Sequence, residues 1–165
     1  FITNNKLLAS ELAAIRKLLP TSGLGIEIGV GTGIFASKLG IKHGVEPSAN
    51  MGDEARKKGI QVKKAAAENL PIDDGTYQYA LMVTVDCFLN DVHKALTEVR
   101  RILVNNGVFI IAFLDRSTPL GKLYEQNKHK HTSYKDANFH SAEVIALLLE
   151  EAGFEIMDKN RRYFH

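Results

Sequence analysis

Apolar residues in this chain alternate between two spacings, one typical of helices and one typical of buried strands. In residues 1–20, leucine and isoleucine recur every three or four positions until Pro20, which predicts an amphipathic leading helix. Short apolar runs rich in β-branched residues predict strands, with helical patterns between them. The expected strands are 24–28, 41–46, 60–65, 79–85, 108–114 and 154–157. This alternation predicts an α/β fold with a parallel sheet, whose central strand is the nearly continuous apolar run 79–85.

Local signals place several helix ends. Asp91 is expected to begin a helix that the Asn106–Gly107 pair stops. Ser141 is expected to cap the last helix, and Gly153 to end it. These positions bound the two long helices of the second half of the chain.

A glycine-rich turn joins the first strand to the next helix, in the sequence LGIEIGVGTGIFASKL of residues 24–39. Its three glycines are Gly29, Gly31 and Gly33. They allow positive φ and remove every Cβ, so the backbone can approach a bulky ligand at the start of the helix. A dinucleotide fingerprint needs Gly or Ala where this chain has Ile34. Glu27 stands just before the glycines, and its carboxylate suits a cationic ligand better than a pyrophosphate.

Glu46 ends the second expected strand and is followed by Pro47. A right-handed crossover places the second strand beside the first, so Glu46 is expected next to the glycine turn. At that position a carboxylate can accept hydrogen bonds from both hydroxyl groups of a ribose.

The segment 27–33 (EIGVGTG) resembles the first motif of class I S-adenosylmethionine-dependent methyltransferases. Residues 45–47 resemble the second motif, and residues 95–113 resemble the helix-turn-strand block of that family. The resemblance implies a doubly wound, mostly parallel sheet with helices on both faces, the Rossmann-like methyltransferase fold. It also implies S-adenosyl-L-methionine as cofactor, whose sulfonium and ammonium groups account for the acid before the glycines.

The loop after the third strand is implied, by the same resemblance, to meet the adenine of the cofactor. Ala67 would offer its backbone N–H, whereas Glu68 could equally be a solvated or capping residue. Family members frequently carry Asp where this chain has Ala66, and an aromatic-Asp pair where it has Tyr77-Gln78. The expected cofactor-binding residues are Glu27, Gly29, Gly31, Gly33, Glu46, Pro47, Ala67, Glu68 and Val83.

The methyl acceptor is expected beyond the fourth strand, where the resembled family often binds it. Asp86 is a candidate for holding or deprotonating the acceptor, and equally for capping the next helix. Residues 115–140 follow the fifth strand at the edge where open sheets bind ligands, which predicts a substrate lid. Tyr124, Tyr134 and His140 are its candidate acceptor-facing residues, and each could equally be packed or on the surface.

Composition narrows the classes of partner. The chain has 165 residues, enough for one domain with a proper core, and its net charge of +2 disfavours nucleic acid. A single cysteine, Cys87, with no signal peptide and no long apolar segment, indicates the cytoplasm and no membrane association. No metal is expected at residues 128–131, because lysines alternate with the histidines and would repel a cation.

These features together predict transfer of a methyl group from S-adenosylmethionine to a small-molecule acceptor by in-line displacement. Two alternatives stay open: a methyltransferase-like module that binds cofactor without catalysis, and an NAD-binding dehydrogenase, against which Glu27 and Ile34 stand. The acceptor and the oligomeric state are left open. The resembled sheet order is 3-2-1-4-5-7-6, so either a tail beyond His165 supplies the seventh strand or the segment from Phe154 pairs with strand five.

Overall fold

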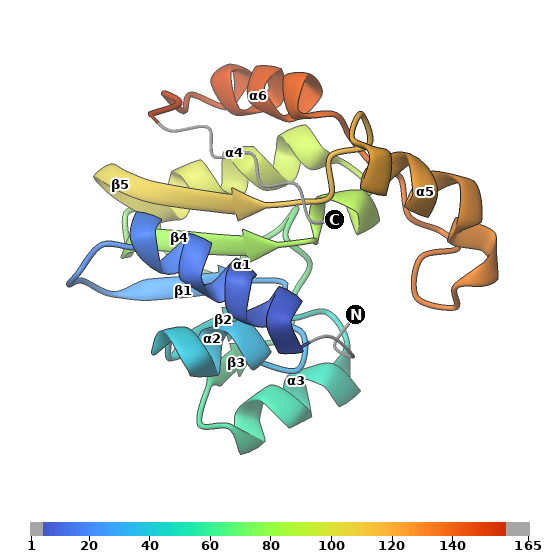
Figure 1. Cartoon of the computed structure of the whole chain (residues 1–165). Coiled ribbons are helices and arrows are strands. Elements are labelled where there is room, and N and C mark those ends of the chain that lie inside the picture. The colour runs from blue at the N-terminus through green and yellow to red at the C-terminus, as the bar shows by residue number, and fades with distance from the viewer. Residues whose placement is uncertain (1–4, 158–165) are drawn as a thin grey trace.

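A computed structural model describes residues 5–157 of the chain. Figure 1 shows a twisted sheet in which the strands run parallel, in the order β3-β2-β1-β4-β5. The strands are β1 (Gly25–Ile28), β2 (His43–Val45), β3 (Gln61–Lys63), β4 (Tyr77–Val83) and β5 (Leu103–Ala112). This order confirms the doubly wound α/β fold that the sequence predicts, including the position of the third strand at the edge.

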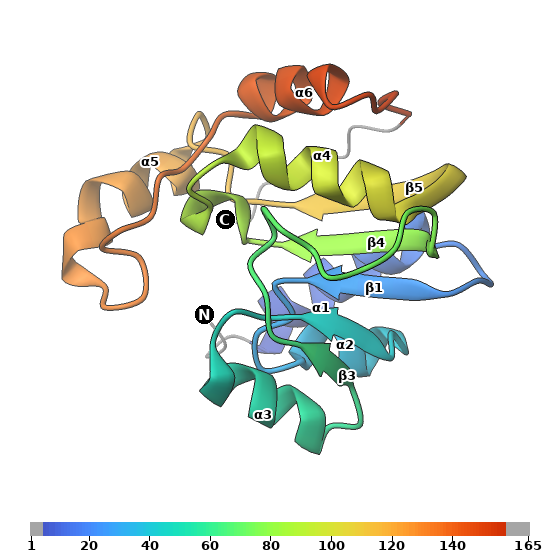
Figure 2. The same ribbon diagram turned by 180° about the vertical axis from the view of Figure 1, so that it is seen from behind.

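Helices cover both faces of the sheet, as Figures 1 and 2 show from opposite sides. One face carries α1 (Asn5–Leu18), α2 (Ile34–Leu39) and α3 (Ala49–Lys57). The other face carries α4 (Val92–Ile102), and α6 (Ala142–Glu151) packs on α4. The helix α5 (Pro119–Asn127) lies beyond the carboxyl ends of the strands, together with the turn η2 (Lys128–Lys130).

Capping residues explain why the helices begin where they do. The side chains of Ser48, Asp91, Thr118 and Ser141 each accept a hydrogen bond from a backbone N–H of the first turn of α3, α4, α5 and α6. Each bond satisfies a donor that has no partner within its own helix. The predicted starts at Asp91 and Ser141 are therefore confirmed.

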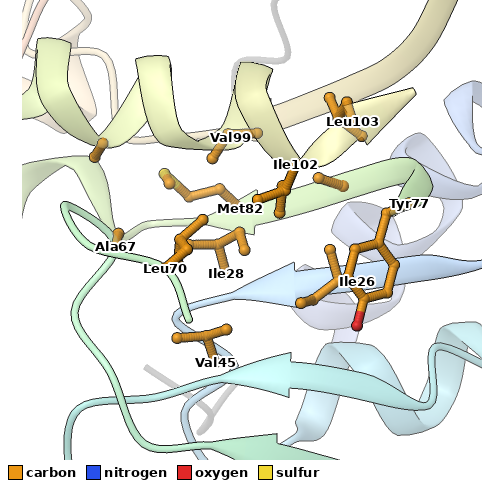
Figure 3. Close-up of a cluster of buried hydrophobic side chains, with 12 residues drawn as sticks. Ile26, Ile28, Val45, Ala67, Leu70, Tyr77, Met82, Val99, Ile102 and Leu103 are labelled. Atoms are coloured by element: carbon orange, nitrogen blue, oxygen red, sulfur yellow. The ribbon is translucent and has the colours of Figure 1, made fainter. Parts of the chain in front are cut away.

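Two apolar clusters hold the helices on the sheet. Figure 3 shows the first, in which Ile28 and Met82 from the strands meet Val99 and Ile102 from α4. The second lies on the opposite face, where Ile15 of α1 and Ala36 of α2 pack with Leu81. Because the central strands are buried on both faces, β1 and β4 are rigid supports for the loops at their carboxyl ends.

The predicted end of the helix before the fifth strand and the predicted start of that strand are both wrong. The helix α4 ends at Ile102 rather than at Asn106–Gly107, because the Leu103 side chain is buried in the first cluster and pairs with the start of β4. The register then shifts before Val108, and Asn106 takes a left-handed φ of 60° in the irregular part of β5. The residues that helical spacing had assigned to the end of α4 therefore belong to the irregular first part of β5.

Residues 154–157 do not form the predicted sixth strand. Phe154 instead turns its ring toward Phe109 of β5, with the two ring centroids 5.3 Å apart, directly after the carboxyl end of α6. The chain therefore uses this segment to cover β5 with a side chain. The expected seventh strand lies outside the described residues.

Candidate functional site

The glycine turn lies at the carboxyl end of β1 and leads into α2. Gly29 and Gly31 both have positive φ, 70° and 55°. A Cβ at Gly29 would lie 2.4 Å from Cγ2 of Val85, whereas a Cβ at Gly31 would approach only the flexible end of Met51, at 3.3 Å. The glycine at position 29 is therefore required by the packing of the chain itself as well as by its backbone conformation.

The turn is fastened to the end of β2. The backbone N–H groups of Gly29 and Val30 both donate to the carbonyl of Val45, at 2.8 and 2.9 Å. One residue later, the Glu46 carboxylate accepts from the N–H of Gly31 at 2.9 Å. The prediction that Glu46 lies beside the glycine turn is thus confirmed as geometry.

Both Glu46 oxygens have partners in the protein. While Oε2 accepts from Gly31, Oε1 accepts from the N–H of Ser48 at 2.9 Å, and the residue is 7% exposed. These bonds fix the orientation of the carboxylate and leave each oxygen a further acceptor site. A group with two neighbouring hydroxyls can be held there without moving the side chain.

Glu27 is buried within β1, with 2% of its surface exposed. Its Oε2 has no hydrogen-bond partner among residues 5–157. Burial raises the pKa of Glu27 to about 8; the nearby Glu46 adds to the shift, and the backbone N–H of Ala36 partly offsets it. A neighbouring cation would favour the ionised form of such a buried carboxylate.

Beyond the carboxyl end of β4, the 3-10 turn η1 (Asp86–Phe88) carries the second group of predicted residues. Asp86 is 2% exposed, and its Oδ2 lies 3.1 Å from Nδ1 of His140. Burial raises the pKa of Asp86, and the hydrogen bond and charge of His140 partly oppose that shift. The structure therefore brings together two predicted residues that stand 54 positions apart in the sequence.

The segment 115–140 is closed at its base by its own backbone. The N–H of Arg116 donates to the carbonyl of His140 at 3.0 Å, and the N–H of Asn138 donates to the carbonyl of Cys87 at 2.7 Å. The two ends of the segment therefore meet beside η1, while α5 and η2 project away from the sheet (Figure 1).

Tyr124 and Tyr134 lie in an aromatic cluster inside this segment. Their rings meet edge to face with centroids 5.5 Å apart, and Tyr134 also stacks on Phe88 at 5.8 Å. Tyr134 is 7% exposed, and burial is the main reason that its pKa is raised. This placement supports a packing role for both tyrosines, and their predicted contact with an acceptor stays a prediction.

The remaining predicted cofactor residues lie in different surroundings. Ala67 is buried in the first cluster (Figure 3), Val83 packs partly buried at the end of β4, and Pro47 is exposed. The Glu68 carboxylate accepts from the N–H groups of Asn90 and Asp91, at 2.9 and 3.3 Å. Glu68 therefore links the loop after β3 to the start of α4, and its predicted contact with adenine stays untested.

One residue near the site was not singled out from the sequence. Glu11 of α1 is half-buried, burial raises its pKa, and its charge contributes to the raised pKa of Tyr134. Its charge therefore acts on Tyr134 of the aromatic cluster. Glu11 precedes Leu12 in an ordinary amphipathic helix pattern, so the sequence alone did not indicate this environment.

Residues 5–157 contain no group of three or more His, Cys, Asp or Glu side chains that could hold a metal ion. None of the helices described there has the length and apolar character needed to cross a membrane. A groove of about 530 Å³ lies elsewhere, beside β2 and β3, and its lining includes none of the predicted cofactor residues.

Comparison with known proteins identifies the family. The sequence model for a methyltransferase domain matches residues 3–159. A Methanocaldococcus jannaschii protein described as uncharacterized is 40% identical over 99% of this chain and 80% of its own length. A Mycobacterium tuberculosis relative, also described as uncharacterized, is 36% identical over 94% of this chain, which spans only 55% of that protein.

A solved structure from Thermotoga maritima is similar in both sequence and fold. It is described as an S-adenosylmethionine-dependent methyltransferase and possible histamine N-methyltransferase. It is 51% identical, with a TM-score of 0.87, over 90% of this chain and 71% of that chain. Our chain therefore belongs to the methyltransferase domain family, and its cofactor is S-adenosyl-L-methionine. Membership of this family decides against the NAD-binding dehydrogenase.

The residues at the end of β1 fit this cofactor. Glu27 offers a buried carboxylate oxygen that lacks a partner among the described residues, which is what a positively charged ligand requires. Gly31 leaves its face of the turn free of any Cβ, and Glu46 holds a fixed carboxylate beside it. When bound, S-adenosylmethionine supplies a methyl group activated by a sulfonium.

Proposed function

We propose that this protein transfers a methyl group from S-adenosylmethionine to a small-molecule acceptor by in-line displacement. The observation that carries the proposal is the buried Oε2 of Glu27, which has no hydrogen-bond partner among residues 5–157, next to a glycine turn that is itself bonded to Glu46. A nucleotide-like ligand with a cationic end would bind both carboxylates, with its cation at Glu27 and its ribose hydroxyls at Glu46. The Thermotoga maritima relative, described as a possible histamine N-methyltransferase, supports an acceptor of small size.

In this proposal, each predicted residue has a defined task. Glu27 provides the negative charge for the cationic end of the cofactor, and Glu46 accepts hydrogen bonds from its ribose hydroxyls. The three glycines allow close approach of the backbone, and a Cβ at Gly31 would meet only the end of Met51 within 4 Å. Pro47, Ala67, Glu68 and Val83 surround the remainder of the cofactor, with the backbone N–H of Ala67 directed at the adenine.

Catalysis in this proposal depends mainly on position. Holding two reactants in line can supply on the order of 7 to 11 kcal/mol of the barrier at best. The 115–140 segment would exclude water from the acceptor, since it lies beyond the carboxyl ends of the strands and closes on η1. No catalytic triad is therefore needed for substantial acceleration.

A module that binds cofactor without catalysis is the alternative. The pair formed by buried Asp86 and partly buried His140 favours catalysis, because two titratable groups in hydrogen-bond contact beyond the end of β4 are typical of active sites. A cytoplasmic location is part of the proposal and rests on the single free cysteine, Cys87, which is buried.

The test combines binding with turnover. Calorimetry with S-adenosylmethionine, S-adenosylhomocysteine and NAD should give binding of the first two alone. A panel of amines, phenols and thiols should then include a molecule that becomes methylated. Cofactor binding without turnover of any panel member would favour the non-catalytic module.

A further inference from the structure

The contact between Asp86 and His140 is built from two distant parts of the chain. Asp86 stands on η1 after β4, and His140 is the last residue of the 115–140 segment, just before α6. Their 3.1 Å contact uses Nδ1 of the ring, which leaves Nε2 as the other ring nitrogen. When Nδ1–H donates to the carboxylate, Nε2 carries a lone pair that can accept a proton.

Several bonds fix this pair in place. The carbonyl of His140 accepts from the N–H of Arg116, and Asn138 donates to the carbonyl of Cys87, the residue after Asp86. Ser141, the residue after His140, caps α6. The imidazole is therefore held by backbone bonds on both sides and by a buried carboxylate, as a preorganised proton acceptor requires.

Charges of both signs surround this site: Arg116 and Lys128 of the same segment are basic, whereas Glu11 and Asp86 are carboxylates. Within residues 5–157, neither Glu11 nor Asp86 forms an ion pair with a lysine or arginine side chain. Glu11 stands on α1, whose amino end lies at the same end of the molecule as α5 and the carboxyl ends of the strands in Figures 1 and 2. A cationic molecule entering beside the 115–140 segment would supply a counter-charge for the half-buried Glu11 carboxylate.

We propose that the acceptor is a basic amine that binds as its ammonium ion, with His140 as the catalytic residue that removes the ammonium proton. Asp86 is the positioning residue that orients the imidazole and stabilises its charged form, and Glu11 attracts the ammonium. This inference rests on the proposed function, because it assigns the acceptor class and the proton acceptor of that same site.

The proton and electron balance is complete. One N–H bond of the ammonium breaks, and its proton moves to Nε2 of His140. The electron pair left on nitrogen forms the new N–C bond, while the pair of the breaking C–S bond stays on the departing sulfur. The imidazolium, held by Asp86, then gives its proton to water, and the methylated amine leaves as an ammonium ion.

The first test uses the unaltered protein saturated with S-adenosylhomocysteine. Calorimetry compares three ligands of matched shape: 2-phenylethylamine, 2-phenylethanol and 3-phenylpropionate. We expect the amine to bind at least about tenfold more tightly than the alcohol, and the carboxylate to bind most weakly. Equal binding of amine and alcohol, or a preference for the carboxylate, would overturn the assignment of the acceptor class.

The second test separates a catalytic role from a structural one. His140→Gln should lower kcat for an amine by about a hundredfold or more, with KM and S-adenosylhomocysteine affinity nearly unchanged. The matched control is His129→Gln, an exposed histidine of the same segment, which should leave kcat unchanged. Asp86→Asn should also lower kcat, with KM and S-adenosylhomocysteine affinity nearly unchanged.

Other titratable groups near the pair are Cys87 on its own turn, Tyr134 in the 115–140 segment and Glu11 on α1. Burial raises the pKa of Cys87 to about 12 and raises that of Tyr134, so both stay protonated near neutral pH. Glu11→Gln removes the charge proposed to attract the ammonium, so it should raise KM for the amine and leave kcat unchanged.

The outcomes distinguish this inference from the proposed function. Failure of S-adenosylhomocysteine to bind the unaltered protein would defeat both. Normal cofactor binding with unreduced kcat in His140→Gln would defeat the catalytic role of His140 alone. Should that variant fail to fold, NMR on the unaltered protein decides: a His140 ring whose chemical shifts ignore bound 2-phenylethylamine would overturn the proposal.

Discussion

The backbone N–H of Gly31 donates a 2.9 Å hydrogen bond to Oε2 of Glu46, across the gap between the loops that follow β1 and β2. This bond ties the glycine turn to the carboxylate proposed to hold the ribose. Because the same carboxylate also accepts from Ser48, its position is set before any ligand arrives. The affinity for the cofactor should therefore depend on Glu46 through both direct contact and preorganisation.

Replacement of this carboxylate gives the first prediction. Glu46→Ala should weaken S-adenosylhomocysteine binding by about tenfold or more, because hydrogen bonds to a charged acceptor are each worth about 1.5 to 3 kcal/mol. Calorimetry measures the loss, and circular dichroism checks that the fold is retained. Exposed Glu150 on α6 offers the control, since Glu150→Gln should bind normally. Unchanged affinity in the Glu46 variant would remove this residue from the site.

Glu27 makes the stability of the ligand-free protein depend on pH. Its pKa is raised from 4.5 to about 8 in the folded chain, so the protonated form is favoured by folding. This contribution to stability is fully present below pH 4.5 and is lost as the pH rises toward about 8. Each pKa unit corresponds to about 1.4 kcal/mol.

Glu27→Gln should therefore unfold at a higher temperature than the unaltered protein at pH 8 and at a similar temperature near pH 5, without ligand. The same variant should bind S-adenosylhomocysteine much more weakly. In the unaltered protein at pH 7, binding should release close to one proton, measured by calorimetry in buffers of different ionisation enthalpy. A variant that is less stable at both pH values, or that binds normally, would contradict this account of Glu27.

Gly40 serves as a control for substitutions at Gly29, because the two glycines have similar positive φ angles. Gly40 has a φ of 75° with open space around its Cβ position, whereas a Cβ at Gly29 would meet Val85. Gly40→Ala should cost only the strain of a left-handed residue, about 1 to 2 kcal/mol. Gly29→Ala should cost about 1 to 3 kcal/mol more, through overpacking, and Gly29→Val should abolish cofactor binding.

The double variant Gly29→Ala with Val85→Ala serves as the check on that explanation. Removing the Val85 methyl groups should restore part of the stability lost in Gly29→Ala, as measured by chemical denaturation. Equal losses in Gly29→Ala and Gly40→Ala would show that contact with Val85 is not what requires glycine at position 29.

The 115–140 segment should respond to ligands. Its ends are fixed by the backbone bonds of Arg116 and Asn138, so motion is expected between them, in α5 and η2. Amide hydrogens of residues 119–135 should exchange more slowly when both S-adenosylhomocysteine and an acceptor are bound. Exchange in β4 should stay unchanged as the internal control. Equal exchange in 119–135 with and without both ligands would argue against a lid.

Local signals explain what the sequence predicted correctly. The caps at Asp91 and Ser141 and the turn at Gly29 act within a few residues, so their chemistry is visible in the order of side chains alone. The position of Glu46 followed from the handedness of a crossover, a general rule of parallel sheets. The fold class could be inferred because these local features agree with one another, and the cofactor was implied by the resemblance of residues 27–33 and 45–47 to methyltransferase motifs.

The features that the sequence did not reveal depend on distant contacts. The start of β5 is fixed by burial of Leu103 against the core, which overrides the helical spacing of the residues before it. The pairing of Asp86 with His140 requires the chain to return over 54 positions. The charge of Glu11 contributes to the raised pKa of Tyr134, a residue more than a hundred positions later in the chain. No local pattern encodes any of these three.

The most direct test of the proposed function follows the methyl group itself. The protein is incubated with methyl-labelled S-adenosylmethionine and a panel of small amines, phenols and thiols, and the products are separated by mass. We predict label in a small-molecule product, formed in equal amount with S-adenosylhomocysteine and lost in Glu27→Gln. Tight binding of the labelled cofactor with no transfer to any panel member would contradict this account.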